Sequence, residues 1–276
     1  MPNNCFPYPG NKARHSKWIL EHIPEHKCYV ELFGGAAGVL FNKPRSKIEV
    51  YNDLNGDIPH FFRVLRDSGD ELQEWLRNVP YSREVHEEWA TSYYDGYRPD
   101  DDIEKAGRFF TLRYTQFGSK IDGKSGFATA ARGSGPPTGS FHTKVEKLHK
   151  FRDRLQKVII ESKPAFEIIK QYDLETTLFY ADPPYINTDS HYAQDGFNHE
   201  KLSRLAKEMD AKIVISYDSI PTHYGDKFNI VSKKSTFAMN QKSGSTDATE
   251  HLIMNYDSKG ESVMSELGQS GLSAYQ

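Results

Sequence analysis

The chain has 276 residues, which is enough for one large α/β domain or for a smaller core that carries an insertion. Hydrophobic residues make up 37% of it, and no apolar run approaches the roughly 18 positions that a membrane-spanning helix needs. Composition therefore indicates a soluble globular protein. The first residues carry neither a basic start nor an apolar stretch, so we expect no secretory signal and a cytoplasmic location.

Cysteine and histidine usage argues against a disulfide framework and against a metal centre. Cys5 and Cys28 are the two cysteines, and the eleven His residues lack metal-ligand spacings such as HExxH. We therefore expect two ordinary thiols and no bound metal.

Charge is distributed unevenly along the chain. The net charge is −3, but residues 103–157 hold twelve Lys and Arg against four Asp and Glu, a local charge of +8 that leaves −11 for the rest. Such asymmetry is typical of a phosphate-facing segment on an otherwise acidic protein. A solvated helix face would account for part of the run over 144–157 and stays open as an alternative.

Seven apolar, β-branched runs predict strands. They are Cys28–Phe33, Lys47–Tyr51, Val158–Glu161, Thr177–Ala181, Lys212–Tyr217, Phe228–Val231 and His251–Tyr256. Helical patterns fall between most of them, at 36–43, 56–68, 164–171, 198–210 and 219–224. Strands that alternate with helices predict an α/β fold with a mainly parallel, doubly wound sheet.

One interval breaks this alternation. Between 61 and 157 the patterns predict helices and no buried strand, with Gly118–Gly133 as a hairpin or loop. The predicted helices are Glu71–Arg77, Arg83–Tyr94, Ile103–Phe117 and Thr143–Lys157. We interpret 1–60 plus 158–257 as one core, 61–157 as a mostly helical insertion, and 258–276 as a disordered polar tail.

Two features in the first part of the chain are typical of a nucleotide-like ligand. The segment from Glu31 to Val39 places Gly34 and Gly35 directly after a strand, where backbone can approach a ligand closely. It matches neither GxGxxG nor the P-loop, so dinucleotides and triphosphates are disfavoured. Asp53 ends the second strand, where a carboxylate can accept hydrogen bonds from ribose hydroxyls, although it could equally cap the helix that begins near Asn55.

The most specific motif is Asp182-Pro183-Pro184-Tyr185, which follows the strand Thr177–Ala181. Two prolines remove two amide donors and prevent strand or helix from continuing, so the loop presents acceptors. Asp182 and the carbonyl of Pro183 can both accept from one amino group, and Tyr185 can stack on a base. Two acceptors on one –NH2 free its lone pair for attack. In isolation the motif could be only a turn.

Together these residues resemble the Dam-like class of adenine-specific DNA methyltransferases over roughly residues 5–257. Residues 6–12, FPYPGNK, are similar to the amino-terminal cofactor motif of that class, usually YPGGK. The glycine segment, Asp53 and the DPPY sequence are similar to its next motifs in the same order, with a target-recognition insertion between the glycine motif and DPPY. Further similarity runs through 106–110, 215–218 and 250–256.

The resemblance implies a Rossmann-like methyltransferase core that uses S-adenosylmethionine, and a cytoplasmic enzyme of bacterial, archaeal or viral type. It implies catalytic roles for Asp182, Pro183, Pro184 and Tyr185. It also implies cofactor contacts from these residues: Tyr8, Pro9, Gly10, Lys12, Glu31, Phe33, Gly34, Gly35, Asp53, Phe166 and Asp182. Ala165 stands where the class often has an acid, so another polar group must contact the cofactor adenine.

The resulting hypothesis is methyl transfer to the 6-amino nitrogen of adenine in double-stranded DNA, after the base is rotated out of the stack. The candidate DNA-binding residues are Arg113, Lys120, Lys124, Arg132 and Lys144. The alternatives are a methyltransferase for the 4-amino group of cytosine and a catalytically silent DNA-binding module. The sequence leaves open the recognition site, the oligomeric state and any cognate restriction endonuclease.

Overall fold

The computed structural model of the chain describes residues 4–117, 123–129, 137–185, 197–236 and 247–258. Its centre is a seven-stranded sheet with the order β3-β2-β1-β4-β5-β7-β6. Strands β1 to β5 all run parallel, whereas β7 pairs antiparallel with both β5 and β6. The strands are β1 (Cys28–Glu31), β2 (Ile48–Asn52), β3 (Val158–Glu161), β4 (Thr177–Ala181), β5 (Lys212–Tyr217), β6 (Asn229–Thr236) and β7 (Asp247–Met254). The α/β class is therefore confirmed.

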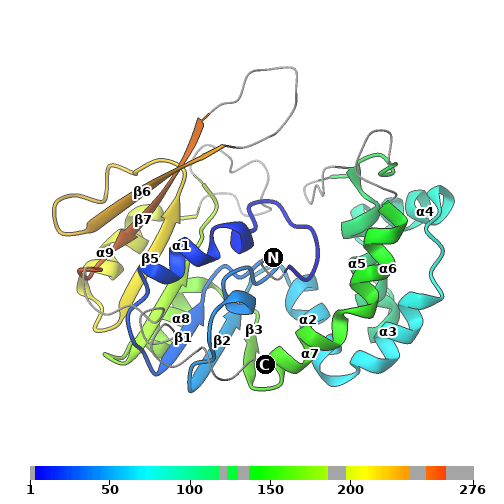
Figure 1. Cartoon of the computed structure of the whole chain (residues 1–276), viewed down its shortest axis with the longest axis horizontal. Helices are drawn as coiled ribbons and strands as arrows, with labels where there is room; N and C mark the ends of the chain where they lie inside the picture. The colour runs from blue at the N-terminus through cyan, green and yellow to red at the C-terminus, as the bar shows by residue number, and fades with distance from the viewer. Residues whose placement is uncertain (1–3, 118–122, 130–136, 186–196, 237–246, 259–276) are drawn as a thin grey trace, which may run out of the picture.

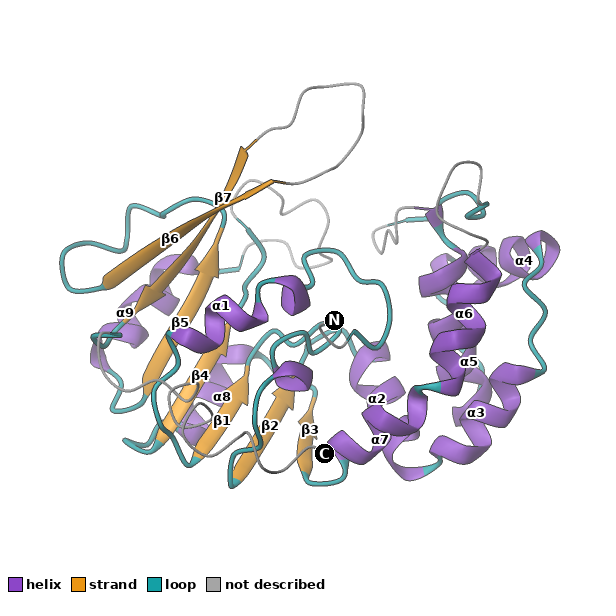
Figure 2. Cartoon of the chain, viewed as in Figure 1, coloured by secondary structure: helices purple, strands orange, loops and turns teal. Residues whose placement is uncertain are grey.

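Successive side chains of the central strands enter two different cores, as a two-residue period requires. Tyr29 and Tyr51 belong to one buried cluster, and their neighbours Val30 and Val50 belong to the other. Helices α1 and α2 contribute to the first cluster, and α8 and α9 contribute to the second, so both faces of the sheet are covered (Figure 2). These helices are α1 (Ser16–Glu21), α2 (Asp57–Asp67), α8 (Ala165–Tyr172) and α9 (His199–Glu208).

In the part of the chain that the structure describes, five further helices follow α2 between β2 and β3. They gather beyond the β3 edge of the sheet (Figure 1) and are α3 (Gly69–Arg77), α4 (Arg83–Tyr94), α5 (Asp102–Thr115), α6 (Pro137–Glu146) and α7 (Leu148–Leu155). Phe61 of α2 stacks on Phe110 of α5 with ring centroids 5.5 Å apart, and Phe6 meets Phe61 edge to face at 5.4 Å. Phe62 of α2 also meets Tyr51 of β2 edge to face at 5.1 Å, so the helices and the sheet share one aromatic core.

Three predicted helices differ from the structure. Residues 36–43 form turns and a short 3-10 helix, η2 (Leu40–Asn42), because the Glu31 carboxylate accepts the N–H of Leu40 and Ala37 has a positive φ of 55°. Residues 219–224 form a turn around Pro221, which has no N–H to donate. The helix predicted over Thr143–Lys157 is divided at Lys147 into α6 and α7.

Strands β6 and β7 are longer than predicted. Strand β6 continues to Thr236 and β7 runs from Asp247 to Met254, because the added residues are mostly polar in sequence and carry no apolar alternation. None of the helices in the described ranges is long and apolar enough to cross a membrane. Cys5 and Cys28 are buried free thiols, and the described residues contain no cluster of three metal-ligating side chains.

Candidate active site at the carboxyl edge of the sheet

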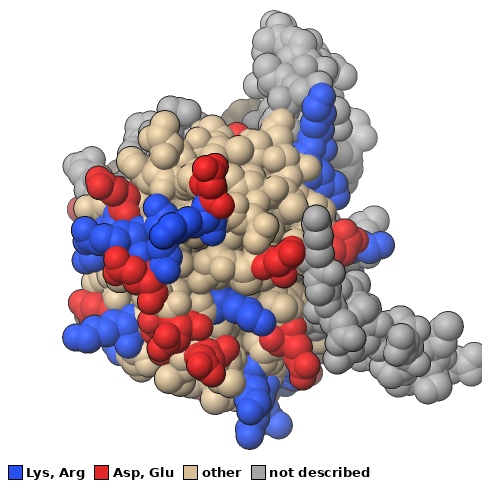
Figure 3. Space-filling view, turned by 90° about the vertical axis from the view of Figure 1, so that its left-hand side faces the viewer, with Lys and Arg blue, Asp and Glu red and all other residues tan. Residues whose placement is uncertain are grey.

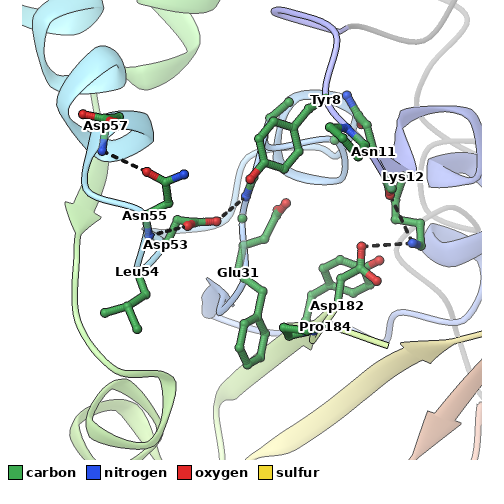
Figure 4. Close-up of a pocket in the computed structure, with 18 of the residues that line it drawn as sticks. Tyr8, Asn11, Lys12, Glu31, Asp53, Leu54, Asn55, Asp57, Asp182 and Pro184 are labelled. Carbon is green, nitrogen blue, oxygen red and sulfur yellow. Dashed lines mark hydrogen bonds and ion pairs between the residues drawn. The ribbon is translucent and has the colours of Figure 1, made fainter. Parts of the chain in front are cut away.

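Three neighbouring strands end at the same edge of the sheet and bring the motif residues together. Glu31 of β1 is aligned with Tyr51 of β2 and with Tyr180 of β4, so Asp53 and Asp182 follow directly beside the glycine turn. Strand order reverses between β1 and β4, and open α/β sheets bind ligands at such a point. A cavity of about 690 Å³ opens there (Figure 4), lined by Tyr8, Pro9, Gly10, Lys12, Glu31, Phe33, Gly34, Gly35, Asp53, Asp182 and Pro184 among others.

The two glycines of the turn are required for different reasons. A Cβ on Gly34 would lie 2.0 Å from the Tyr51 ring, whose hydroxyl donates to the Gly35 carbonyl at 2.6 Å. Gly35 has a φ of +48°, and a Cβ there would lie 2.9 Å from the Tyr8 ring, across the mouth of the cavity. Gly34 therefore allows the strands to pack, and Gly35 keeps the cavity open.

Asp53 is fixed on both sides. Its Oδ2 accepts the N–H of Gly35 at 2.8 Å and its Oδ1 accepts the N–H of Asn55 at 2.8 Å. Helix α2 begins only at Asp57, so Asp53 bridges the turn and the loop and does not cap the helix. Burial raises the pKa of Asp53 to about 6.

Glu31 is a second acid in the cavity wall, only 2% exposed. Its Oε2 accepts from the Tyr29 hydroxyl and from the N–H of Leu40, both at 2.8 Å. Burial raises the pKa of Glu31 to about 7. The hydrogen bonds favour the charged form and oppose this shift, but burial has the larger effect. Glu31 therefore holds the turn after β1 in place while it faces the cavity.

Asp182 lies across the cavity from Asp53 and is paired on one side only. Lys12 Nζ lies 3.0 Å from Asp182 Oδ2, and Lys12 also donates to the Gly10 carbonyl at 3.1 Å. Within the described part of the chain, Asp182 Oδ1 is buried and has no hydrogen-bond partner. A buried acceptor of this kind is costly unless a ligand satisfies it. Burial raises the pKa of Asp182 to about 6, although Lys12 opposes the shift.

The rest of the DPPY loop surrounds this carboxylate. Pro184 lines the cavity, whereas Pro183 and Tyr185 are not among the residues of its wall. The Tyr185 ring lies 4.9 Å from Lys12 Nζ, and its hydroxyl donates to Glu250 Oε1 at 2.9 Å. Tyr185 is therefore held at its hydroxyl end beside Asp182.

A second, smaller cavity of about 230 Å³ adjoins the first. Phe33 and Leu54 line both, and Phe166 and Ala165 complete the wall of the second. Phe166 stacks on Phe197 with ring centroids 5.3 Å apart at 12°. Flat apolar walls suit a planar heterocycle. Phe166 therefore lies in the second cavity, and the other predicted cofactor residues line the first.

The three predicted DNA-binding residues that the structure describes differ in exposure. Arg113 is 1% exposed and donates to Gln116 Oε1 at 2.7 Å, so its position does not support a contact with DNA. Lys144 is half-buried and donates to the Asn4 carbonyl, whereas Lys124 is exposed and donates to Thr91. Lys120 and Arg132 lie outside the described residues.

Part of the basic stretch binds the protein itself. Arg152 pairs with Asp70, Arg154 with Glu49, and Arg108 with Glu104. Besides Lys124, three lysines of this stretch are exposed: Lys147 between α6 and α7, Lys150 on α7 and Lys157 in the loop that follows. On the face around β6 and α9 the two signs of charge are interspersed (Figure 3), so this face is not a positive surface of one sign.

Two groups of residues at the site were not predicted from the sequence. Glu250 of β7 lies 3.6 Å from Lys12 Nζ. Tyr93 and Arg98, from the helical segment, reach Asp57 and extend the wall of the larger cavity. A signal for Glu250 was present, since a buried acid within an apolar strand needs a partner; no sequence signal identified Tyr93 or Arg98.

Comparison with known proteins adds an independent finding. A family model described as D12 class N6 adenine-specific DNA methyltransferase matches residues 8–263. A type II methyltransferase of Lactococcus lactis subsp. cremoris is 26% identical, over 90% of this chain and 94% of its own length. One of Methanocaldococcus jannaschii is also 26% identical, over 90% and 97%. A DNA adenine methylase of Vibrio cholerae is 23% identical, over 84% and 89%.

Proposed function

Since the chain belongs to the D12 class of N6 adenine-specific DNA methyltransferases and thus methylates adenine in DNA, we propose that S-adenosylmethionine is its methyl donor and lies across the two cavities. When bound, this cofactor supplies a methyl group that is already activated by a positive sulfur. The residues that line the two cavities support an assignment for each of its three parts. In this assignment Gly35 and Glu31 would hold the methionine part, Asp53 the ribose, and Phe33 and Phe166 the adenine.

The open cradle at Gly35 supports this fit. A Cβ at that position would reach the Tyr8 ring, so the glycine preserves the space between the turn and the amino-terminal segment. At the adenine end Ala165 supplies no carboxylate. Helix α8 begins there, and the first N–H groups of a helix have no partner within it, so they can serve as polar contacts.

The unpaired oxygen of Asp182 is the observation that carries the proposed mechanism. Oδ1 can accept one N–H of the adenine amino group, and the Pro183 carbonyl can accept the other. Both contacts strengthen as the nitrogen becomes tetrahedral, which frees its lone pair for attack on the methyl group. Lys12 holds Oδ2 and so keeps Oδ1 directed at the amine.

We further propose that the substrate is duplex DNA and that the target base is flipped out of the helix. Extruding a base costs a few kcal/mol. Stacking on Tyr185 offsets part of this cost, at about 1–3 kcal/mol by analogy with single-strand binders. The helical segment between β2 and β3 is the proposed target-recognition unit, with the exposed Lys124, Lys147 and Lys150 facing phosphate.

Asp182→Ala tests this mechanism. The wild-type protein, incubated with plasmid DNA and S-adenosylmethionine, should produce N6-methyladenine and no N4-methylcytosine by nucleoside mass spectrometry. The variant should lose methyl transfer, while calorimetry shows that it binds the cofactor nearly as well. Near-normal turnover in the variant would refute the role of Asp182, and failure of the wild type to bind the cofactor would refute the donor.

A further inference from the structure

Glu250 is a buried acid beside the candidate active site that the mechanism above does not use. It lies on β7, is 5% exposed, and reaches the site because β7 pairs with β5 in the sheet. Burial raises its pKa, and Lys12 opposes the shift. A buried carboxylate is costly unless it is paired and hydrogen-bonded, so its partners indicate what it does.

Two side chains of the site, Tyr185 and Lys12, contact the Glu250 carboxylate. Its Oε1 accepts the Tyr185 hydroxyl at 2.9 Å and lies 3.6 Å from Lys12 Nζ. The same ammonium lies 3.0 Å from Asp182 Oδ2. A single lysine is thus shared between two carboxylates, and the second carboxylate also holds the tyrosine ring.

Glu49 offers a contrast on the same sheet. It is 2% exposed and is paired with Lys43 at 2.8 Å and with Arg154. None of these three residues lines either cavity. Glu49 therefore has a similar degree of burial and a lysine partner but no contact with the site.

We propose that Glu250 is a positioning residue for methyl transfer. Its carboxylate fixes the Tyr185 ring through the hydroxyl and restrains the Lys12 ammonium, so that Asp182 presents Oδ1 to the target amine. This inference rests on the proposed function. It assigns Glu250 a role through Tyr185 and Lys12 and no contact with the substrate.

The variants separate the hydrogen bond from the charge. Glu250→Gln retains an acceptor for the Tyr185 hydroxyl and removes the charge near Lys12, whereas Glu250→Ala removes both. Tyr185→Phe removes the hydroxyl and keeps the stacking ring. Because hydrogen bonds to charged groups are among the strong ones, we expect kcat to fall about 10- to 100-fold in Glu250→Ala and less in Glu250→Gln. The KM for S-adenosylmethionine should change less than threefold, roughly the scatter of such contributions.

The decisive measurement is a double-mutant cycle. If Glu250 acts through the Tyr185 hydroxyl, the kcat losses of Glu250→Ala and Tyr185→Phe should be clearly less than additive in the double variant. Glu49→Gln is the matched control, and its kcat per cofactor-binding molecule should equal that of the wild type. Thermal unfolding of each variant records the cost of removing a buried acid.

Three results would overturn the inference: wild-type kcat in Glu250→Ala, fully additive losses, or an equal loss of kcat in Glu49→Gln. The proposed function is tested separately in the same assay, because it depends only on methyl transfer by the wild type. The inference depends on the ratios of the variants to the wild type.

Discussion

Protonation of individual carboxylates connects the structure to activity at the residue scale. Asp182, Asp53 and Glu31 are all raised in pKa by burial, to about 6, about 6 and about 7. An amine is held by the charged form of Asp182, because a protonated carboxyl offers a donor at one of its oxygens. An exposed Asp has a pKa near 4. Because the pKa of Asp182 is higher, this carboxylate loses its charge at a higher pH as the solution is acidified.

The first prediction concerns pH. We expect kcat/KM for DNA to fall as pH is lowered through about 6, with cofactor kept saturating so that titration of Asp53 and Glu31 does not limit binding. Single-turnover rates between about pH 5 and about pH 8 measure this limb. A flat profile over that range would show that Asp182 either stays charged or is not required as an acceptor.

At the scale of the elements, several cations of the basic stretch over 103–157 form ion pairs with acids of neighbouring helices and strands. Arg152 and Arg154 of α7 point to acids on α3 and β2, and Arg113 of α5 is interior. The net charge of +8 over residues 103–157 therefore overestimates the number of cations in this stretch that are free to bind phosphate. Exposed lysines such as Lys124 are the better candidates for phosphate contact.

A salt-dependence experiment tests this distinction. Lys124→Ala should weaken DNA binding and reduce the slope of log affinity against log salt by about 0.9, the value for one phosphate contact. Arg152→Ala is the matched control, since Arg152 is paired with Asp70, and it should leave the slope unchanged. Fluorescence anisotropy with labelled duplex DNA gives both slopes. Equal slopes for Lys124→Ala and the wild type would remove Lys124 from the interface.

A single aromatic core joins the helical segment to the sheet at the scale of the whole molecule. Tyr29, Tyr51 and Leu178 from the sheet belong to the same buried cluster as Phe110 and Phe141 from the helices. Arg98 also binds Asp57 of α2 at 2.8 Å, directly after the loop that carries Asp53. The helical segment and the sheet should therefore not unfold independently.

Tryptophan positions make this testable. Trp75 and Trp89 stack on each other in the helical segment at 5.8 Å, and Trp18 lies on α1 against the sheet. Denaturant unfolding followed by tryptophan fluorescence and by far-ultraviolet circular dichroism should give coincident transitions. The Trp75→Phe/Trp89→Phe double variant leaves Trp18 as the probe and should report the same midpoint as its circular dichroism. Two separate midpoints would mean that the segment is an independent unit.

The sequence by itself determined the strand positions, the glycine turn and the DPPY loop. These depend on neighbouring residues: a two-residue period, glycine where backbone must approach closely, and proline where N–H groups are absent. It also predicted helices at 36–43 and 219–224 that do not form. The Glu31 side chain of the preceding strand accepts the N–H of Leu40, and Pro221 has no N–H to donate.

Only the tertiary structure decided which charged groups meet. Lys12, Asp182 and Glu250 are far apart in the chain. Asp182 and Glu250 approach each other because β4, β5 and β7 follow one another in the sheet, and the amino-terminal segment brings Lys12 to both. The burial of Arg113 likewise follows from the packing of other elements around α5. From the sequence alone, an arginine in a helical pattern is expected to be exposed. Contacts of this kind depend on strand order and helix packing, which the pattern of neighbouring residues does not encode.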